Sequence, residues 1–431
     1  MLKRIDLRGI TGDYSGLLPR ATVDISAAMA EVTPLLDSIR TNGADPIKEV
    51  IQRRDGVALT RFRVPGEALT EAREAQSRSF LDACEVSISR VRTVHEAQLP
   101  DDYETQVAIG GTVTARHVAV SRVGLYVPGG LAPLASSVIM NAVPASLAGV
   151  DNIAVASPPQ RDTGLPDSKI LAVCALLGIE EVYAVGGPAA IGMFAYGAQE
   201  CRPVDMVCGP GNVYVTAAKR AVRGQVAIDT EAGTTEIAIL ADAYADPAHV
   251  AVDLMSQAEH DPNAASVVIS PRRELLDAVE TQLDARVMAA KHAQRIRSAL
   301  TGAQSGAVHV EDLEQGVAVV DAYAAEHLEI HTENAAELAM QVRNAGAIFV
   351  GPYSPVSLGD YCAGSNHILP TSGYARHSAG LSVHSFLRLI NVVEYSQDAL
   401  RAVAQDVKVF ADAEDLPAHG DAVAARWPDE R

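Results

Sequence analysis

The chain has 431 residues, 48% of them hydrophobic and 21% charged, which is an ordinary globular composition and enough for two or three domains. Aspartate and glutamate outnumber lysine and arginine by 54 to 35, giving a net charge of −19. This acidic excess repels phosphate backbones and anionic lipid, so we expect no nucleic-acid partner and no membrane. The five cysteines include no CxxC pair and the N-terminus MLKRIDLRGI has no apolar signal segment, so we expect a cytoplasmic protein.

The first half of the chain combines helical patterns with short β-rich runs. The first hundred residues are mostly helical in pattern, and Leu81–Gln98 is clearly amphipathic. Between Val123 and Thr235 a βαβ series follows. Its predicted strands are Asn152–Ser157, Glu181–Val185 and Val204–Val207, and its predicted helices are Asp167–Leu177, Pro188 to about Gly197, and a helix ending near Val222.

A second series of the same kind occupies the second half. Its predicted strands are Glu236–Ala241, Ser266–Ser270, Val308–Val310 and Ala347–Val350. Its predicted helices are Asp246 to His260, Arg273–Ala289 and Leu313–Ala325, and Ser396–Trp427 has a helical pattern interrupted at Pro417. This alternation predicts an α/β fold with mainly parallel strands.

Two polar groups could bind a metal or move protons. Gln257 and His260 are three residues apart near a predicted helix end, so both project from one face, as two ligands of one metal must. The alternative is a solvated polar helix end. Glu326 and His327 could supply a general base and a proton shuttle. The alternative here is a surface glutamate beside a capping histidine.

Three further features could belong to a site. The predicted loop 355–367 places Asp360, Asn366 and His367 between glycines, although it could also be a turn-rich surface loop. The glycine turns 186–187 and 209–212 each join a strand to a helix and could hold phosphate, with tight packing an equal explanation. Cys208 and Cys362 are possible nucleophiles, but free cysteine is more often a small buried hydrophobe.

Six long motifs, in this order, resemble the histidinol dehydrogenase family. The resemblance runs from about Val123 through His419 and rests on VGLYVPGG, VDMVCGPGNVYVTAAKR, LMSQAEHD, AYAAEHLEIHTENA, GAIFVGPYSPVSLGDYCAGSNHILPTSG and AEDLPAHG. It implies a homodimeric enzyme with one Zn2+ per subunit that uses NAD to oxidise L-histidinol, through the aldehyde, to L-histidine.

The resemblance also implies roles for individual residues. Glu326 and His327 would be the catalytic acid–base residues. The metal ligands would be Gln257, His260, Asp360 and His419. The substrate would contact these six residues together with Thr235, His367 and Glu414. The cofactor positions would be Tyr126, Ala189 and Asn212, where Ala189 replaces the glutamine usual in the family.

The domain organisation that we expect combines the two series with this resemblance. It consists of two incomplete Rossmann-like α/β domains with mainly parallel sheets, a helical N-terminal arm and a small C-terminal helical segment. The arm would span 1–20, the metal and substrate domain 21–122 and 236–376, the cofactor domain 123–235, and the dimerisation tail 377–431. The segment Glu414–His419 would complete the site of the neighbouring subunit.

Three other functions stay open. A member of the same family that oxidises another polar alcohol is favoured by Ala189, whereas His367, Glu414 and His419 count against it. A zinc hydrolase could use the same metal ligands and a nearby glutamate to activate water, but the glycine turns count against it. A non-catalytic metal-binding or imidazole-binding subunit would require Glu326 and His327 to be silent.

Overall fold

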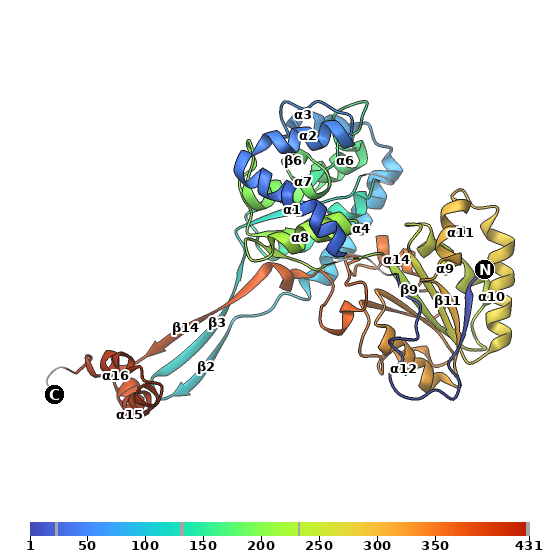
Figure 1. Cartoon of the computed structure of the whole chain (residues 1–431). Helices are drawn as coiled ribbons and strands as arrows, with labels where there is room; N and C mark the ends of the chain where they lie inside the picture. Colours follow the sequence, from blue (N-terminus) through green and yellow to red (C-terminus); the bar gives the residue numbers. More distant parts are fainter. Residues whose placement is uncertain (22–24, 130–132, 232, 428–431) are drawn as a thin grey trace. The chain divides into compact units, whose positions relative to one another are not determined.

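The computed structural model describes residues 1–21, 25–129, 133–231 and 233–427 (Figure 1). The chain forms two compact units. Unit 1 comprises Met1–Gln98 and Ser121–Phe386, and unit 2 comprises Leu99–Val120 and Leu387–Arg431. Gly130, the last residue of the motif VGLYVPGG, lies outside the described residues.

Unit 1 contains a six-stranded sheet, here called sheet A, in the order β1-β11-β10-β9-β12-β13. All its strand pairs are parallel. The strands are β1 (Lys3–Asp6), β9 (Glu236–Ala241), β10 (Ala265–Ser270), β11 (Gly306–His309), β12 (His327–His331) and β13 (Ala347–Val350). Every residue of β9, β10 and β12 is buried, as is typical of a parallel sheet covered on both faces.

Helices cover both faces of sheet A. One face packs against α9 (Pro247–Ala258), α10 (Arg273–Val287) and α11 (Ala293–Thr301), and the other against α12 (Leu313–Tyr323) and α13 (Ala335–Ala339). Ile237 and Ile239 of β9 point into the first layer, and Ala238 and Leu240 point into the second. This alternation explains why the whole strand reads as an apolar run.

A second sheet in unit 1, here called sheet B, has five strands in the order β6-β5-β4-β7-β8. All its pairs are parallel as well. The strands are β4 (Arg122–Tyr126), β5 (Asn152–Ser157), β6 (Glu181–Ala184), β7 (Met206–Cys208) and β8 (Ala227–Ile228). The predicted α/β class with mainly parallel sheets is therefore confirmed.

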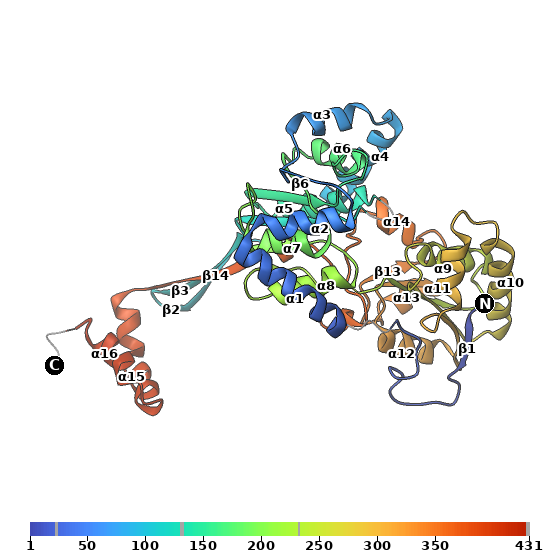
Figure 2. The ribbon, with the colours of Figure 1, turned by 45° about the horizontal axis from the view of Figure 1, so that its top comes forward.

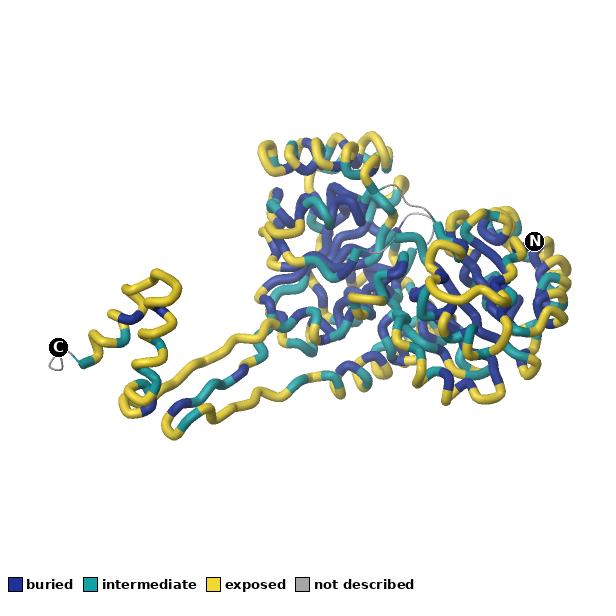
Figure 3. The backbone as a smooth tube through the Cα atoms, turned by 60° about the horizontal axis from the view of Figure 1, so that its bottom comes forward, coloured by how far each residue is buried: buried dark blue, intermediate teal, exposed yellow. Residues whose placement is uncertain are grey.

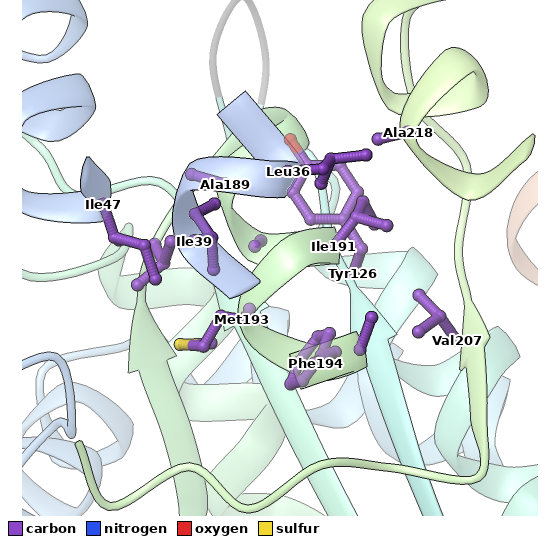
Figure 4. Close-up of a cluster of buried hydrophobic side chains, with 14 of the residues drawn as sticks. Leu36, Ile39, Ile47, Tyr126, Ala189, Ile191, Met193, Phe194, Val207 and Ala218 are labelled. Atoms are coloured by element: carbon purple, nitrogen blue, oxygen red, sulfur yellow. The ribbon is translucent and has the colours of Figure 1, made fainter. Parts of the chain in front are cut away.

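The helices of sheet B also form two layers. On one face, α1 (Ile25–Asn42) packs against α7 (Gly187–Tyr196) and α8 (Val213–Val222), with α2 (Ala44–Arg54) beside them (Figure 2). Leu36 and Ile39 of α1 meet Ile191 of α7 in an apolar cluster (Figure 4). On the other face α5 (Ala135–Leu147) lies beside α6 (Ser168–Leu176), and α3 (Gly66–Glu74) and α4 (Arg78–Glu96) pack against them.

Two local predictions were wrong. The N-terminal arm was expected to be helical, but it forms β1, and Ile5 pairs with Val308 at the edge of sheet A. Leu2 packs into one helix layer of this sheet and Leu7 into the other. The predicted loop 355–367 contains a short helix, α14 (Val356–Tyr361). Six residues are too few for a helical period to appear in a sequence.

Unit 2 has a different architecture. Its antiparallel sheet has the order β14-β3-β2, formed by β2 (Tyr103–Ala108), β3 (Gly111–Ala119) and β14 (Leu387–Tyr395). The sequence analysis did not predict this sheet. The predicted C-terminal helices are confirmed as α15 (Gln397–Ala413) and α16 (Pro417–Ala424). Figure 3 shows that β14 and β2 are largely exposed. By contrast, β9, β10 and β12 of sheet A and β4 of sheet B are buried throughout.

The short 3-10 turns η1 (Tyr374–Arg376) and η2 (Val383–Phe386) complete unit 1. In the part of the chain that the structure describes, no helix has the length and apolar character needed to cross a membrane.

Candidate active site

Glu326 and His327 lie at the amino end of β12, beside the amino end of β9. The Glu326 carboxylate accepts hydrogen bonds from the Thr235 hydroxyl at 2.5 Å and from the Glu236 backbone N–H at 2.9 Å, both at Oε2. The His327 Nδ1–H donates to the Glu236 carbonyl at 3.3 Å, and Nδ1 lies 3.6 Å from Glu326 Oε2. Both side chains can therefore act on one substrate, although they are adjacent in sequence.

Burial tunes both groups. It raises the pKa of Glu326 to about 7, against the opposing hydrogen bonds from Thr235 and Glu236. Burial also lowers the pKa of His327, although the Asp360 carboxylate opposes this shift. Near neutral pH, Glu326 can therefore exchange a proton while His327 is a neutral imidazole. These are the states that an acid–base pair requires.

Three of the predicted metal ligands also lie in unit 1. His260 Nε2 is 3.9 Å from Asp360 Oδ2. The Gln257 amide donates to the Thr235 hydroxyl, which leaves Gln257 Oε1 buried and without a hydrogen-bond partner among the described residues. A buried oxygen of this kind needs a ligand, and a set of nitrogen and oxygen donors suits zinc. The residues present therefore fit a metal ion.

Thr235 links the predicted metal ligands to the acid–base pair. It accepts from Gln257 and donates to Glu326, so one hydrogen-bonded chain joins the two groups. The charges of His260 and Asp360 also act on the Glu326 carboxyl. The structure thus brings together predicted residues from four separate segments of the sequence.

His367 is held beside the same group. Its Nδ1–H donates to the Asp360 carbonyl at 3.0 Å, which leaves Nε2 to accept from the Ser137 hydroxyl at 3.2 Å. Burial lowers the pKa of His367, and the Asp360 carboxylate opposes the shift. His367 is therefore a neutral imidazole with a defined orientation.

Glu414 and His419 belong to unit 2. Glu414 ends α15, with its backbone N–H bonded to Phe410, and His419 lies in α16, with its N–H bonded to Leu416. The structure therefore groups Thr235, Gln257, His260, Glu326, His327, Asp360 and His367 in unit 1 and these two residues in unit 2. The roles assigned to all nine remain predictions.

The predicted cofactor residues lie at the carboxyl edge of sheet B. Tyr126 ends β4, and its hydroxyl accepts from the Gly187 backbone N–H at 3.1 Å. Burial raises the pKa of Tyr126 to about 12, so the phenol stays protonated. Asn212 caps α8 by accepting from the backbone N–H of Tyr214 at 3.0 Å. Ala189 lies in the first turn of α7 and is fully buried in the cluster of Figure 4.

The turn before α8 is rigid. Gly209 has a φ of +121°, and a Cβ there would lie 2.0 Å from the carbonyl oxygen of Tyr126. The Gly209 N–H donates to Asp229 at 2.9 Å, and its carbonyl accepts from Lys219 at 3.1 Å. Only glycine fits this approach, so the turn that leads to Asn212 packs at Gly209 against the end of β4.

A cavity opens at the same edge of sheet B. Its volume is about 520 Å³, and it is lined by Arg54 and Asp55 at the end of α2, Gly129 beyond β4, and residues 158–162 beyond β5. Arg161 belongs to this lining, so two guanidinium groups border the space. Asp55 and Asp162 line it as well, so two carboxylates balance the two guanidinium groups. The cavity lies at the carboxyl ends of parallel strands, where α/β sheets commonly bind nucleotides.

Glu236 and Arg20 also lie beside the acid–base pair, and neither was predicted from the sequence. Glu236 is buried at the start of β9, 3.5 Å from the guanidinium of Arg20, which stacks over the Tyr323 ring at 4.3 Å. Burial and the nearby Glu326 carboxylate raise the pKa of Glu236 to about 7, and Arg20 opposes the shift. A glutamate at the start of the apolar run EIAILA was the signal that could have revealed it.

A second polar cluster was not predicted from the sequence either. Asp253 of α9 lies beside Glu329 and His331 of β12, with ligand atoms all within 4.8 Å of one another. His327, Glu329 and His331 alternate along β12 and therefore share one of its faces. That alternation in HLEIH was the available signal.

The chain resembles known proteins over almost its whole length. A family model described as histidinol dehydrogenase matches residues 18–427. The histidinol dehydrogenase of Thermobifida fusca (strain YX) is 57% identical over 431 residues, covering 100% of this chain and 98% of the relative. That of Nocardia farcinica (strain IFM 10152) is 56% identical, covering 99% and 98%. A crystal structure of histidinol dehydrogenase from Elizabethkingia anophelis matches with a TM-score of 0.92 and 30% identity, covering 99% and 98%.

Proposed function

The chain belongs to the histidinol dehydrogenase family, and from this premise we propose how its own residues oxidise L-histidinol to L-histidine. It is an oxidoreductase that acts in the last step of histidine biosynthesis. The observation that carries the proposal is the buried pair Glu326 and His327, joined through Thr235 to Gln257.

The proposed ligands of one Zn2+ per subunit are Gln257, His260 and Asp360, together with His419 from a second copy of the chain. The unpartnered Gln257 oxygen and the short distance from His260 to Asp360 support this set. The proposed NAD site lies at the carboxyl edge of sheet B, near Tyr126, the backbone of Ala189, and Asn212. When bound, zinc would anchor the imidazole and amine of the substrate, and NAD would accept the hydride.

Each residue of the acid–base pair acts as the base in one of the two oxidations. His327, as a neutral imidazole, takes the proton of the substrate hydroxyl while the carbon loses a hydride, and L-histidinal forms. Glu326, in its ionised form, then takes a proton from a water molecule that attacks the aldehyde. The resulting hydrate loses a second hydride and becomes L-histidine. Thr235 orients the Glu326 carboxylate throughout, and each oxidation removes two electrons.

The stoichiometry of the purified enzyme tests this proposal. With zinc, excess NAD and L-histidinol, we expect two NADH and one histidine for each histidinol consumed, with loss of activity in a chelator and recovery on adding zinc. A panel of other polar alcohols should give much slower turnover. If no histidine forms under these conditions, the proposal is wrong.

We also propose that the enzyme is a homodimer whose sites are shared between subunits. Unit 2 supports this, because its sheet, the turn between β2 and β3, and α15 expose a group of large apolar side chains that a monomer would leave in water. They are Val107, Ile109, Leu389, Ile390, Val392, Val393, Val409 and Phe410. The same unit carries Glu414 and His419, so a second copy would both cover this surface and complete the site.

Hybrid dimers test the sharing of sites. Glu326→Gln and His419→Ala should each inactivate the homodimer, but a hybrid has one intact site if His419 acts in the neighbouring subunit. Mixing the two variants should therefore restore about a quarter of the wild-type activity, since about half of the dimers are hybrids. No restoration on mixing, or a fully active monomer, would contradict the proposal.

Because all five cysteines are free, we place the enzyme in the reducing cytoplasm.

A further inference from the structure

The cluster of Asp253, Glu329 and His331 has no part in the mechanism proposed above, yet Glu329 and His331 are buried in the core of sheet A and Asp253 is half-buried. Glu329 is fully buried, and both of its oxygens are engaged. His331 Nε2 lies 3.1 Å from Oε2, and the backbone N–H of Val356 donates to Oε1 at 2.8 Å. A fully buried carboxylate is tolerated only when it is paired in this way.

The bond to Val356 matters because of the helix that it holds. Val356 is the first residue of α14, and Asp360 is carried by the same six-residue helix. So short a helix has little stability of its own, and its orientation depends on what it contacts. Glu329 supplies the contact at its first N–H.

The other end of α14 is set by Phe349 of β13. A Cβ on Gly359 would lie 2.5 Å from the Phe349 ring, so the helix backbone packs directly on that ring. The Phe349 ring in turn lies against His327, with ring centroids 6.1 Å apart. Neighbouring strands of sheet A therefore hold both ends of the helix that carries Asp360.

We propose that Glu329 is a positioning residue for the metal site: by holding the first turn of α14, it directs the Asp360 carboxylate toward His260. His331 and Asp253 keep the Glu329 carboxylate in place. This inference rests on the proposed function, because it takes Asp360 to be a metal ligand.

A metal ion within the cluster is the competing explanation. Both Glu329 oxygens are already occupied, so an ion would have to displace His331 or the Val356 N–H. Asp253 is also accounted for. Burial and the neighbouring Glu329 raise the pKa of Asp253 to about 8, so at neutral pH its carboxyl group carries the proton that it shares with Glu329. The hydrogen bonds and the proton within the cluster therefore account for its buried polar groups without a metal ion.

Zinc affinity, measured by competition with a chromophoric chelator, tests the proposal without relying on turnover. Glu329→Leu removes the acceptor for Val356 and should weaken zinc binding roughly 10- to 100-fold, the usual effect of losing a residue that supports a metal ligand. Glu329→Gln keeps a carbonyl oxygen in place and should lose less than about fivefold. Val268→Ala, a cavity variant in the same sheet core, should lower the Tm but leave zinc affinity unchanged.

A double-mutant cycle with Asp360→Asn separates this inference from the proposed function. If Glu329 acts through Asp360, the Leu substitution should add little to the loss already caused by Asp360→Asn. Additive losses would overturn the inference. No loss from Asp360→Asn alone would instead overturn the proposed metal role of that residue.

Two further measurements keep the test decisive. If Glu329→Leu does not fold, His331→Gln replaces it in the cycle, with a smaller zinc loss expected because the Val356 bond remains. Metal analysis of the wild-type chain should find one zinc. Two zinc ions per chain, with one lost in Glu329→Gln, would show that the cluster is itself a metal site and would overturn the inference.

Discussion

Sheets A and B share one strand order, but their predicted site residues lie at opposite edges. In both sheets, apart from β1, the first strand in sequence is central, the next two follow on one side of it, and the last two follow on the other side. This gives β11-β10-β9-β12-β13 in sheet A and β6-β5-β4-β7-β8 in sheet B, and sheet A has β1 as an additional edge strand. The polar groups of sheet A lie where β9 and β12 begin, around Glu236 and His327. The predicted cofactor residues lie where β4 ends and where α7 and α8 begin.

The polarity of the adjoining helices explains why the two edges suit different ligands. At the amino edge of sheet A, α9 ends beside Gln257 and His260, and the carboxyl end of a helix is partially negative, which favours a cation. At the carboxyl edge of sheet B, α7 and α8 begin, and their free N–H groups favour an anion such as a phosphate. The proposed metal site and the proposed NAD site therefore each lie at the edge whose helix ends have the matching partial charge.

At the amino edge of sheet A, Glu326→Gln should cause the largest loss of activity. The amide cannot take a proton from water, so the second oxidation should slow by roughly 10²- to 10⁴-fold, the usual contribution of a general base. The first oxidation should be less affected, so histidinal should accumulate and be trapped by a carbonyl reagent. Glu337→Gln, an exposed change on α13, is the control. Equal slowing of both oxidations would contradict the division of roles between Glu326 and His327.

At the carboxyl edge of sheet B, Gly209→Ala should lower both stability and NAD binding. The added Cβ would meet the Tyr126 carbonyl oxygen at 2.0 Å, and the backbone is held by Asp229 and Lys219. We expect a loss of about 3 kcal/mol or more in unfolding free energy and weaker NAD binding. Gly149→Ala is the matched control, since Gly149 also has a positive φ but no atom within 4 Å of the added Cβ. It should cost only about 1 kcal/mol. Similar losses at both positions would show that the close approach to Tyr126 is unimportant.

The sequence predicted the parallel strands of unit 1 better than the antiparallel sheet of unit 2, and the reasons are physical. The buried strands were predicted well because parallel strands covered on both faces are continuous apolar runs, and β9 and β5 occupy the predicted residues. The antiparallel sheet of unit 2 was missed because Leu387–Tyr395 is exposed along its length and pairs with residues far away in sequence. No local period marks such a strand.

The site was predicted through motifs rather than through topology. Glu326 and His327 were identified as a pair, but their contacts with the Glu236 backbone depend on the register between β9 and β12, which no local pattern gives. Glu329 was missed because its partner Val356 offers a backbone N–H, and a backbone donor leaves no mark in a sequence.

The charge at the amino edge of sheet A can be examined through pH. The pKa of Glu236 is about 7 in the folded protein against an ordinary value of 4.5, so between these values the folded state binds more protons than the unfolded state. The free energy of unfolding should therefore fall as pH rises across this range. Glu236→Gln cannot ionise, so its stability relative to wild type should rise by an amount of the order of 3 kcal/mol from pH 4.5 to 7.

Urea unfolding of both proteins in the presence of a chelator, at several pH values, measures this difference. The pKa of Glu326 is raised in the same direction, and the comparison between variant and wild type removes the part of its contribution that does not depend on the charge of Glu236. Parallel stability curves for the two proteins would show that Glu236 does not carry the charge expected at this edge.

The smallest effect, Ala189→Gln, sharpens the account of the cofactor edge. The Ala189 side chain is fully buried among apolar residues, while its backbone N–H belongs to the first turn of α7. If the residue serves a cofactor through that N–H, restoring the family glutamine should bury an amide without a partner and lower stability by about 1–3 kcal/mol. The KM for NAD should change less than about twofold, a difference worth under half a kcal/mol. Ala189→Ser, a smaller polar change, should lower the Tm less. Tighter NAD binding by the glutamine variant at an unchanged Tm would instead mean that this side chain reaches the cofactor, and this edge would then bind its ligand through side chains, as we propose for sheet A.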